Sequence, residues 1–155
     1  MSRTPREVAE LVRRMVAGEG VVFADLFAED GLLNYPFAAP GQPPQLQGRE
    51  AIREFFDGMA RSGSRELFEQ EGDVTAVIRQ TDDPEVVVAE IRHHGWSKVA
   101  NAPYSLTALG VIRVRDGQIV QYDDYMNPIA LATALGRAAD LAAALTSSAT
   151  GVDAT

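Results

Sequence analysis

The stretch that most constrains the fold lies at residues 111–128, VIRVRDGQIVQYDDYMNP. Val111 to Arg115 alternates apolar and basic residues, Asp116-Gly117 is a dipeptide typical of tight hairpin turns, and residues 119–126 resume extended character. Asn127-Pro128 then supplies a helix N-cap and a proline at the first helical position. We therefore expect a β-hairpin followed directly by a helix.

Side chains in the second strand of this hairpin alternate between the two faces of a sheet. Tyr122, Asp124 and Met126 share one face, so Asp123 and Tyr125 share the other. An acid flanked by a tyrosine and a methionine is typical of a carboxylate directed into a partly apolar space. Burial of that kind raises the pKa of a carboxyl group and suits general acid or base catalysis. The alternative interpretation is a solvent-facing strand acid, because parity alone does not say which face is inside.

The rest of the chain divides into helices first and strands afterwards. Thr4-Pro5-Arg6-Glu7 has the spacing of a capping box, and apolar residues recur after it at helical intervals, so we expect a first helix to about Gly18. The patterns predict these further elements: a short helix over 21–27, a turn at Asp30-Gly31 and a strand over 32–35, a helix over 49–59, strands over 66–79, 85–94 and 104–115, and a terminal helix from Ile129. This order makes the expected fold class α+β.

The chain of 155 residues is long enough to bury one substantial core. We expect a single domain over residues 1–146, followed by a small, polar and flexible tail over 147–155. A strongly twisted sheet wrapped around helices leaves a pocket lined by inward-facing strand residues. The proline-punctuated loop over 36–44 is expected to fold over the mouth of that pocket.

Composition and charge exclude several classes of function. The net charge of −8 leaves no concentrated basic surface for phosphate, so a nucleic acid is not expected as a partner. The absence of cysteine excludes disulfides, thiol nucleophiles and thiolate metal sites. Neither a signal peptide nor an apolar run long enough to cross a bilayer is evident, so we expect a cytoplasmic protein without a membrane partner.

Four stretches carry a family resemblance: LFAEDGLLNYPF at 26–37, LQGREAIREFF at 46–56, VVVAEIRHHGW at 86–96 and VRDGQIVQYDDYMNP at 114–128. Together they resemble the SnoaL-like, or nuclear-transport-factor-2-like, superfamily, whose fold is shared with ketosteroid isomerase. The resemblance implies a cone-shaped fold in which a strongly curved, mostly antiparallel sheet wraps around the N-terminal helices. It is closest to the SnoaL-like polyketide cyclases and the phenazine-biosynthesis A/B proteins, and it implies a homodimer.

The two acids of ketosteroid isomerase are missing from this chain. The resemblance aligns the aspartate base of that enzyme with Tyr35, in Asn34-Tyr35-Pro36, and its oxyanion-donating aspartate with Gly110. Isomerisation of a steroid through that pair is therefore not expected. The Asp-Arg-Asp relay of the related epoxide hydrolases is not evident either. Water addition to an epoxide is a third hypothesis, and it would require an acid pair around an arginine in the pocket.

Strand parity and the resemblance together nominate the site residues. Asp124 matches the acid of the phenazine-protein motif and is the expected acid or base. Glu90 and His94 share one strand face and His93 the other; the family position favours His94 as a proton shuttle, against a solvated face or an ion pair. Tyr35 either donates a hydrogen bond to a substrate oxygen or plugs the pocket floor. The expected substrate-binding residues are Glu90, Trp96, Tyr104, Tyr122, Met126 and Phe56.

Together with these nominations, the resemblance implies a cofactor-independent isomerase or cyclase of secondary metabolism, such as antibiotic biosynthesis, acting on a small, largely apolar intermediate of polyketide or phenazine type. Asp124 moves a proton, His94 assists it, and Tyr35 holds a substrate oxygen while the pocket folds the substrate towards its reactive conformer. No metal site is expected, because the two histidines lie on opposite strand faces. The alternative is a non-catalytic small-molecule-binding module of the same fold, motivated by the missing isomerase acids.

Overall fold

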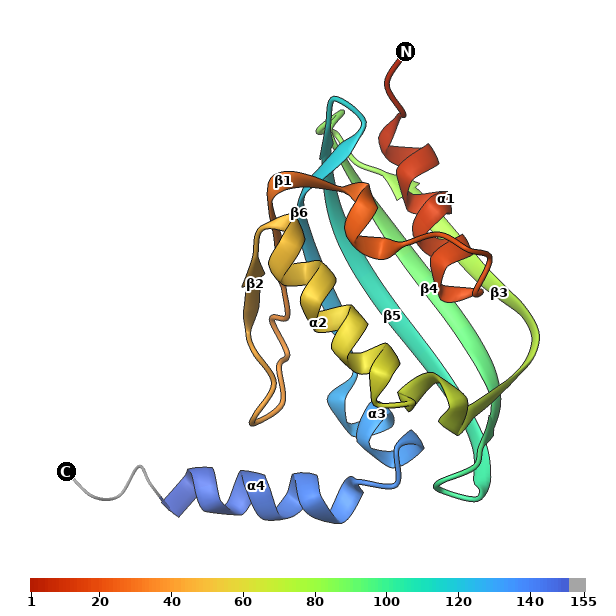
Figure 1. Cartoon of the computed structure of the whole chain (residues 1–155), viewed down its shortest axis with the longest axis vertical. Helices are drawn as coiled ribbons and strands as arrows, with labels where there is room; N and C mark the ends of the chain where they lie inside the picture. The colour runs from red at the N-terminus through yellow and green to blue at the C-terminus, as the bar shows by residue number, and fades with distance from the viewer. Residues whose placement is uncertain (151–155) are drawn as a thin grey trace.

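A computed structural model describes residues 1–150 and shows one curved six-stranded sheet (Figure 1). The strands are β1 (Phe27–Asn34), β2 (Gln45–Gln47), β3 (Phe68–Gln80), β4 (Val86–Ser97), β5 (Ala102–Arg115) and β6 (Gln118–Met126). Their order across the sheet is β2-β1-β6-β5-β4-β3. Strands β1 and β6 run parallel, whereas every other neighbouring pair is antiparallel. The predicted α+β class and the mostly antiparallel, curved sheet are confirmed.

Helices α1 (Pro5–Val16) and α2 (Arg49–Arg61) cover one face of this sheet (Figure 1). The predicted capping box starts α1: the Thr4 hydroxyl accepts from the Glu7 amide at 3.3 Å, and the Glu7 carboxylate accepts from the Thr4 amide at 2.7 Å. Two short 3-10 helices, η1 (Phe23–Leu26) and η2 (Ser64–Leu67), lead into β1 and β3. We refer to the helix-covered face as the inner face of the sheet and to the other as the outer face.

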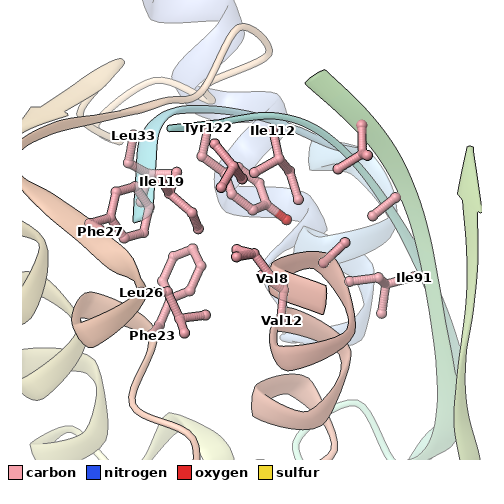
Figure 2. Packing of buried hydrophobic residues seen from close by; sticks show 14 of the residues in the cluster. Val8, Val12, Phe23, Leu26, Phe27, Leu33, Ile91, Ile112, Ile119 and Tyr122 are labelled. Carbon is pink, nitrogen blue, oxygen red and sulfur yellow. The ribbon is translucent and has the colours of Figure 1, made fainter. Parts of the chain in front are cut away.

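The main core lies between the inner face and the helices (Figure 2). The Phe23 ring meets Phe27, Phe56 and Tyr122 edge to face, with centroid separations of 5.0, 5.0 and 5.5 Å. These contacts bury Tyr122 of β6 to 4% exposure. Since side chains alternate along a strand, the burial of Tyr122 fixes which residues of β6 face inward.

Strand β1 differs from its prediction. It begins at Phe27, so the predicted turn at Asp30-Gly31 is wrong and this dipeptide lies inside the strand. The pairing of β1 with β6 shifts register between Phe27 and Leu32, which marks an irregularity in the strand at the place where the turn was expected. Gly31 is needed there, because a Cβ at this position would lie 2.8 Å from the Ile119 carbonyl oxygen.

The single terminal helix predicted from Ile129 is also wrong. Two helices, α3 (Pro128–Ala134) and α4 (Ala138–Thr150), are separated at Gly136, whose φ of +67° ends α3. The predicted N-cap is confirmed, since the Asn127 side chain accepts from the Ile129 and Ala130 amides at 3.0 and 3.1 Å.

Helix α4 extends away from the body of the molecule (Figure 1). It continues four residues past 146, the predicted end of the domain, and residues 151–155 of the predicted tail lie outside the described residues. The single-domain assignment therefore stays a prediction. None of the described helices combines the length and the apolar character that crossing a membrane requires.

Candidate functional site

A cavity of about 590 Å³, open to solvent, lies where β6 meets the C-terminal helices. Its size falls within the usual range for a small-molecule site, about 300–1,000 Å³. Four parts of the chain line it: the end of β6, the loop after β1, helix α2, and the α3–α4 pair. The principal lining side chains are Asp124, Met126, Tyr35, Phe37, Phe55, Met59, Leu131, Leu135, Arg137, Asp140 and Leu141.

Asp124 faces this cavity from the inner face of the sheet. It lies two residues beyond the buried Tyr122 and pairs across the strands with Gly110 of β5. Asp123 points outward, where its Oδ1 accepts from Asn34 Nδ2 at 2.7 Å and Gln121 Nε2 at 3.1 Å. Strand parity thus separates two adjacent acids into a cavity acid and a hydrogen-bonded outer acid.

The carboxyl group of Asp124 lacks the partners that its neighbour has. Its Oδ1 is buried and has no hydrogen-bond partner among the residues that the structure describes. Burial raises the pKa of Asp124 from 3.8 to about 6. A carboxyl group with this pKa exists in both protonation states near neutral pH, as an acid–base catalyst requires.

Tyr35 lines the same cavity immediately after β1. Its ring is buried beside that of Phe55, with centroids 6.5 Å apart. Burial, and then the negative charge of Asp124, raise the pKa of the Tyr35 phenol above its usual value. The hydroxyl group is therefore protonated at neutral pH and available as a hydrogen-bond donor.

The loop over residues 36–44 borders the cavity, as expected from its prolines. Its two ends are joined by the Tyr35 amide, which donates to the Pro44 carbonyl at 2.8 Å. Phe37 lines the cavity and packs edge to face on Tyr125, with centroids 5.3 Å apart. The loop consequently contributes both an aromatic wall and part of the rim.

The structure does not bring His94 to Asp124, and this nomination needs correction. Ala89 and Ile91 of β4 are buried in the core, so residues of odd number in this strand point inward and His94 points outward. His94 is exposed on the outer face, opposite Ser105 of β5. It cannot assist a proton transfer inside the cavity from this position.

His93 is the inward-facing histidine of β4, but it does not line the cavity. Its Nδ1 lies 3.3 Å from the Tyr104 hydroxyl, and burial lowers its pKa, with a smaller contribution from His94. Tyr104 in turn packs on Phe68, with ring centroids 4.8 Å apart, in a second apolar cluster beneath α3. The predicted substrate contact by Tyr104 is thus replaced by a packing role.

The other expected substrate-binding residues divide between the outer face, the core and the cavity. Glu90 lies on the outer face, where hydrogen bonds from Arg92 and Arg79 lower its pKa. Trp96 shares that face and is partly exposed. The rest are placed as follows: Phe56 and Tyr122 belong to the core, and Met126 lines the cavity.

Sequence reasoning missed much of the apolar lining. Phe55 and Phe56 are adjacent in α2, and Phe55 rather than Phe56 reaches the cavity. The contributions of Leu135 and Leu141 depend on the break between α3 and α4, which a continuous helical pattern does not predict. Met59 lies four residues after Phe55 in α2, so the two side chains share one face of the helix. This spacing is visible in the sequence.

Two charged residues, Arg137 and Asp140, lie exposed at the rim. Among the described side chains, no ion pair joins Arg137 to Asp140 or to Asp124, so an Asp-Arg-Asp relay is not assembled. The described residues also contain no group of three or more His, Cys, Asp or Glu side chains arranged to hold a metal ion.

Comparisons with known proteins agree with this architecture. Residues 8–122 match the model of the SnoaL-like domain. An uncharacterised PhzA/B-like protein of Pseudomonas aeruginosa is 31% identical over 125 residues, covering 81% of this chain and 84% of that protein. The crystal structure of a provisionally named isomerase from Bacillus subtilis superposes with a TM-score of 0.70 at 25% identity, covering 87% of this chain and 97% of that one.

More distant solved structures share the fold. A phenazine biosynthesis-related protein from Pseudomonas aeruginosa has a TM-score of 0.56 at 21% identity, covering 84% of each chain. Other neighbours are named for polyketide cyclases, for NTF2-like proteins and for the ketosteroid isomerase-like fold. These neighbours establish the architecture of the chain.

Proposed function

Because this chain belongs to the SnoaL-like domain family and its cavity has the size of a small-molecule site, we propose that it is a cofactor-independent isomerase or cyclase. Its substrate is a small, largely apolar intermediate of polyketide or phenazine type. Asp124 is the general acid or base of the reaction, and Tyr35 is the hydrogen-bond donor to a substrate oxygen.

One observation carries this proposal: a carboxyl group with a pKa of about 6 lines an apolar cavity without a positive partner among the described residues. A structural acid in a fold is normally paired or solvated, as Asp123 is by Asn34 and Gln121. An unpaired buried acid costs stability, and such costs are concentrated at functional sites.

The two side chains support proton transfer next to a carbonyl group. Asp124 removes a proton from carbon, so that a C–H bond breaks and an O–H bond forms on the carboxyl group. The electron pair moves towards the carbonyl oxygen, where the Tyr35 hydroxyl stabilises the developing charge by a hydrogen bond. Return of the proton to another carbon restores the carbonyl group and completes an isomerisation. Ring closure instead forms a C–C bond from the carbanion to a second carbonyl carbon of the substrate; the π bond of that carbonyl breaks, and the resulting alkoxide takes the proton back from Asp124.

The proposal can be tested before the substrate is known, with 5-nitrobenzisoxazole, a flat apolar compound that opens to a coloured phenolate when a base removes its ring proton. We expect the protein to accelerate this reaction above the rate in carboxylate buffer, with a rate that rises with pH through about 6 as Asp124 ionises. Asp124→Asn should lower the rate by about 100-fold or more, since the base is removed.

Asp123→Asn is the matched control, because it alters the adjacent acid on the outer face. It should leave the rate within twofold of the original. A rate that Asp124→Asn leaves unchanged, or a pH profile without a transition near 6, contradicts the assignment of Asp124 as the base.

A non-catalytic binding module is the second candidate, and the cavity itself favours it in one respect. The positions that the resemblance aligns with the two acids of ketosteroid isomerase hold Tyr35 and Gly110 instead. The described cavity lining contains two acids, Asp124 and the exposed Asp140, so no second acid accompanies Asp124 inside the cavity. Under this alternative, Asp124→Asn retains the biological function and no proton-transfer activity is found.

A further inference from the structure

We propose that the natural ligand of the cavity carries a protonated amine on an apolar body, and that the ammonium group pairs with Asp124. This ligand class rests on the proposed function in taking the cavity as the substrate site, and it adds one ammonium group to the largely apolar substrate proposed there. An ammonium group beside Asp124 favours the ionised carboxylate, so the pairing keeps Asp124 in the form that accepts a proton. Three features of the cavity support it: an uncompensated negative charge, an aromatic wall, and a rim that adds no net charge.

The negative charge belongs to Asp124. Among the described side chains, no arginine, lysine or histidine lies within ion-pair distance of its carboxyl group, and no positive charge contributes to its pKa. An ionised carboxylate in an apolar surrounding is unfavourable without a partner. An ammonium group supplies both the missing charge and N–H donors, whereas a carboxylate ligand would add repulsion.

The aromatic wall consists of Tyr35, Phe37 and Phe55, on two different elements around the cavity. The faces of aromatic rings attract cations, and the attraction strengthens where water is excluded. The thioethers of Met59 and Met126 complete a surface that accepts an apolar body. Acid and rings together favour a molecule with one positive end and an apolar remainder.

The remaining titratable groups around the cavity leave this balance unchanged. Tyr35 and Tyr122 have raised pKa values because they are buried, so both phenols are neutral near pH 7. Arg137 and Asp140 at the rim carry opposite charges. The strand residue facing Asp124 is Gly110, which carries no side chain. The net charge of the cavity is therefore set by Asp124.

Calorimetric titration with three ligands of similar size tests this ligand class: benzylammonium, benzyl alcohol and benzoate. Benzylammonium stays protonated at both pH 5 and pH 8, so its affinity reports the ionisation of Asp124. With a pKa of about 6, binding should be about tenfold tighter at pH 8 than at pH 5. Benzyl alcohol should bind equally at both pH values, and benzoate should bind more weakly than either at pH 8.

Variants assign the effect to one carboxyl group. Asp124→Asn should remove both the preference for benzylammonium and its pH dependence, while Asp123→Asn retains them. Benzyl alcohol binding to Asp124→Asn confirms that this variant keeps its cavity. The ligand class is overturned if benzyl alcohol binds as tightly as benzylammonium at pH 8, if the preference survives Asp124→Asn, or if benzylammonium does not bind.

These outcomes separate the ligand class from the proposed catalysis. Equal binding of amine and alcohol, together with proton transfer that depends on Asp124, removes the ammonium ligand and leaves the enzyme. A preference for benzylammonium that depends on Asp124, in a protein without proton-transfer activity, leaves the ligand class and favours the binding module.

Discussion

At the scale of single residues, the unpaired acid has a cost that can be measured. The folded-state pKa of Asp124 is about 6, above its ordinary value of 3.8, so the folded state binds the proton more tightly than the unfolded state. Stability is therefore lower above pH 6, where the carboxylate is ionised, and recovers as the pH falls through 6 towards 4.

Replacing the acid by its neutral isostere should remove this cost. We expect Asp124→Asn to raise the free energy of unfolding by about 2 kcal/mol at pH 8, and by much less at pH 4, where the carboxyl group is already protonated in the folded state. Urea unfolding at the two pH values measures the difference. Asp123→Asn should give no such gain, and an equal gain at both pH values would contradict the raised pKa.

The alternation in β6 predicted that Asp124 faces a partly apolar space, and the structure places it there, whereas the predicted position of His94 beside it is wrong. Asp124 is flanked on its own face by Tyr122 and Met126, so the apolar face of β6 is visible from alternation alone. In β4 the alternation is hidden, because Val86 and Val88 on the outer face are as apolar as Val87 on the inner face. Family position therefore decided in favour of His94. The burial of Ala89 and Ile91 decides against it, because it puts the odd-numbered residues of β4 on the inner face and His94 on the outer face.

At the scale of elements, the break between α3 and α4 shapes the site. The leucine and alanine spacing after Ile129 is compatible with one helix, and a glycine within such a pattern is usually tolerated. Gly136 instead adopts a φ of +67°, and the chain changes direction there. The change brings Leu141 and Ala144 of α4 to the cavity. This local conformation could not be derived from periodicity, which carries no information on backbone dihedrals.

Gly110 provides a test of the packing between β5 and β6. A Cβ at this position would lie 2.5 Å from the Tyr122 hydroxyl oxygen and 2.7 Å from its Cζ. The Tyr122 ring cannot retreat, because Phe23 and Phe27 pack against it. We expect Gly110→Ala to lower the free energy of unfolding by about 2 kcal/mol, as overpacked core substitutions do.

Gly58 in α2 is the matched control, since the nearest atom to a Cβ there is Arg61 Nη2 at 3.8 Å. Gly58→Ala should raise the free energy of unfolding by about 0.5–1 kcal/mol, because alanine favours a helix interior over glycine. Denaturant titration compares the two variants directly. Two alanine substitutions with effects of the same sign would contradict this account of the β5–β6 packing.

At the scale of the whole molecule, the outer face of the sheet differs from the helix-covered inner face. It carries large apolar side chains that are partly exposed: Val77 on β3, Trp96 on β4 and Leu109 on β5, at 48, 36 and 36%. Ion pairs of Glu90 with Arg79 and Arg92 lie on the same face. Val77 and Leu109 are the register partners of Glu90 on the two neighbouring strands, so apolar side chains and ion pairs are interspersed on this face. Large apolar side chains left partly exposed on an uncovered sheet face are typical of an interaction surface.

We propose that two copies of the chain associate through this outer face, as the family resemblance implies. Leu109→Arg should then convert the protein to a monomer at micromolar concentration, because it would place a bulky charged group among the apolar side chains of the interface. Sedimentation velocity measures the change. Val22→Arg is the control, since Val22 is similarly exposed, at 50%, but precedes η1 on the helix-covered side. The cavity opens on the inner face, so a Leu109→Arg monomer should still bind benzylammonium. Loss of binding on monomerisation would instead mean that the partner contributes to the site.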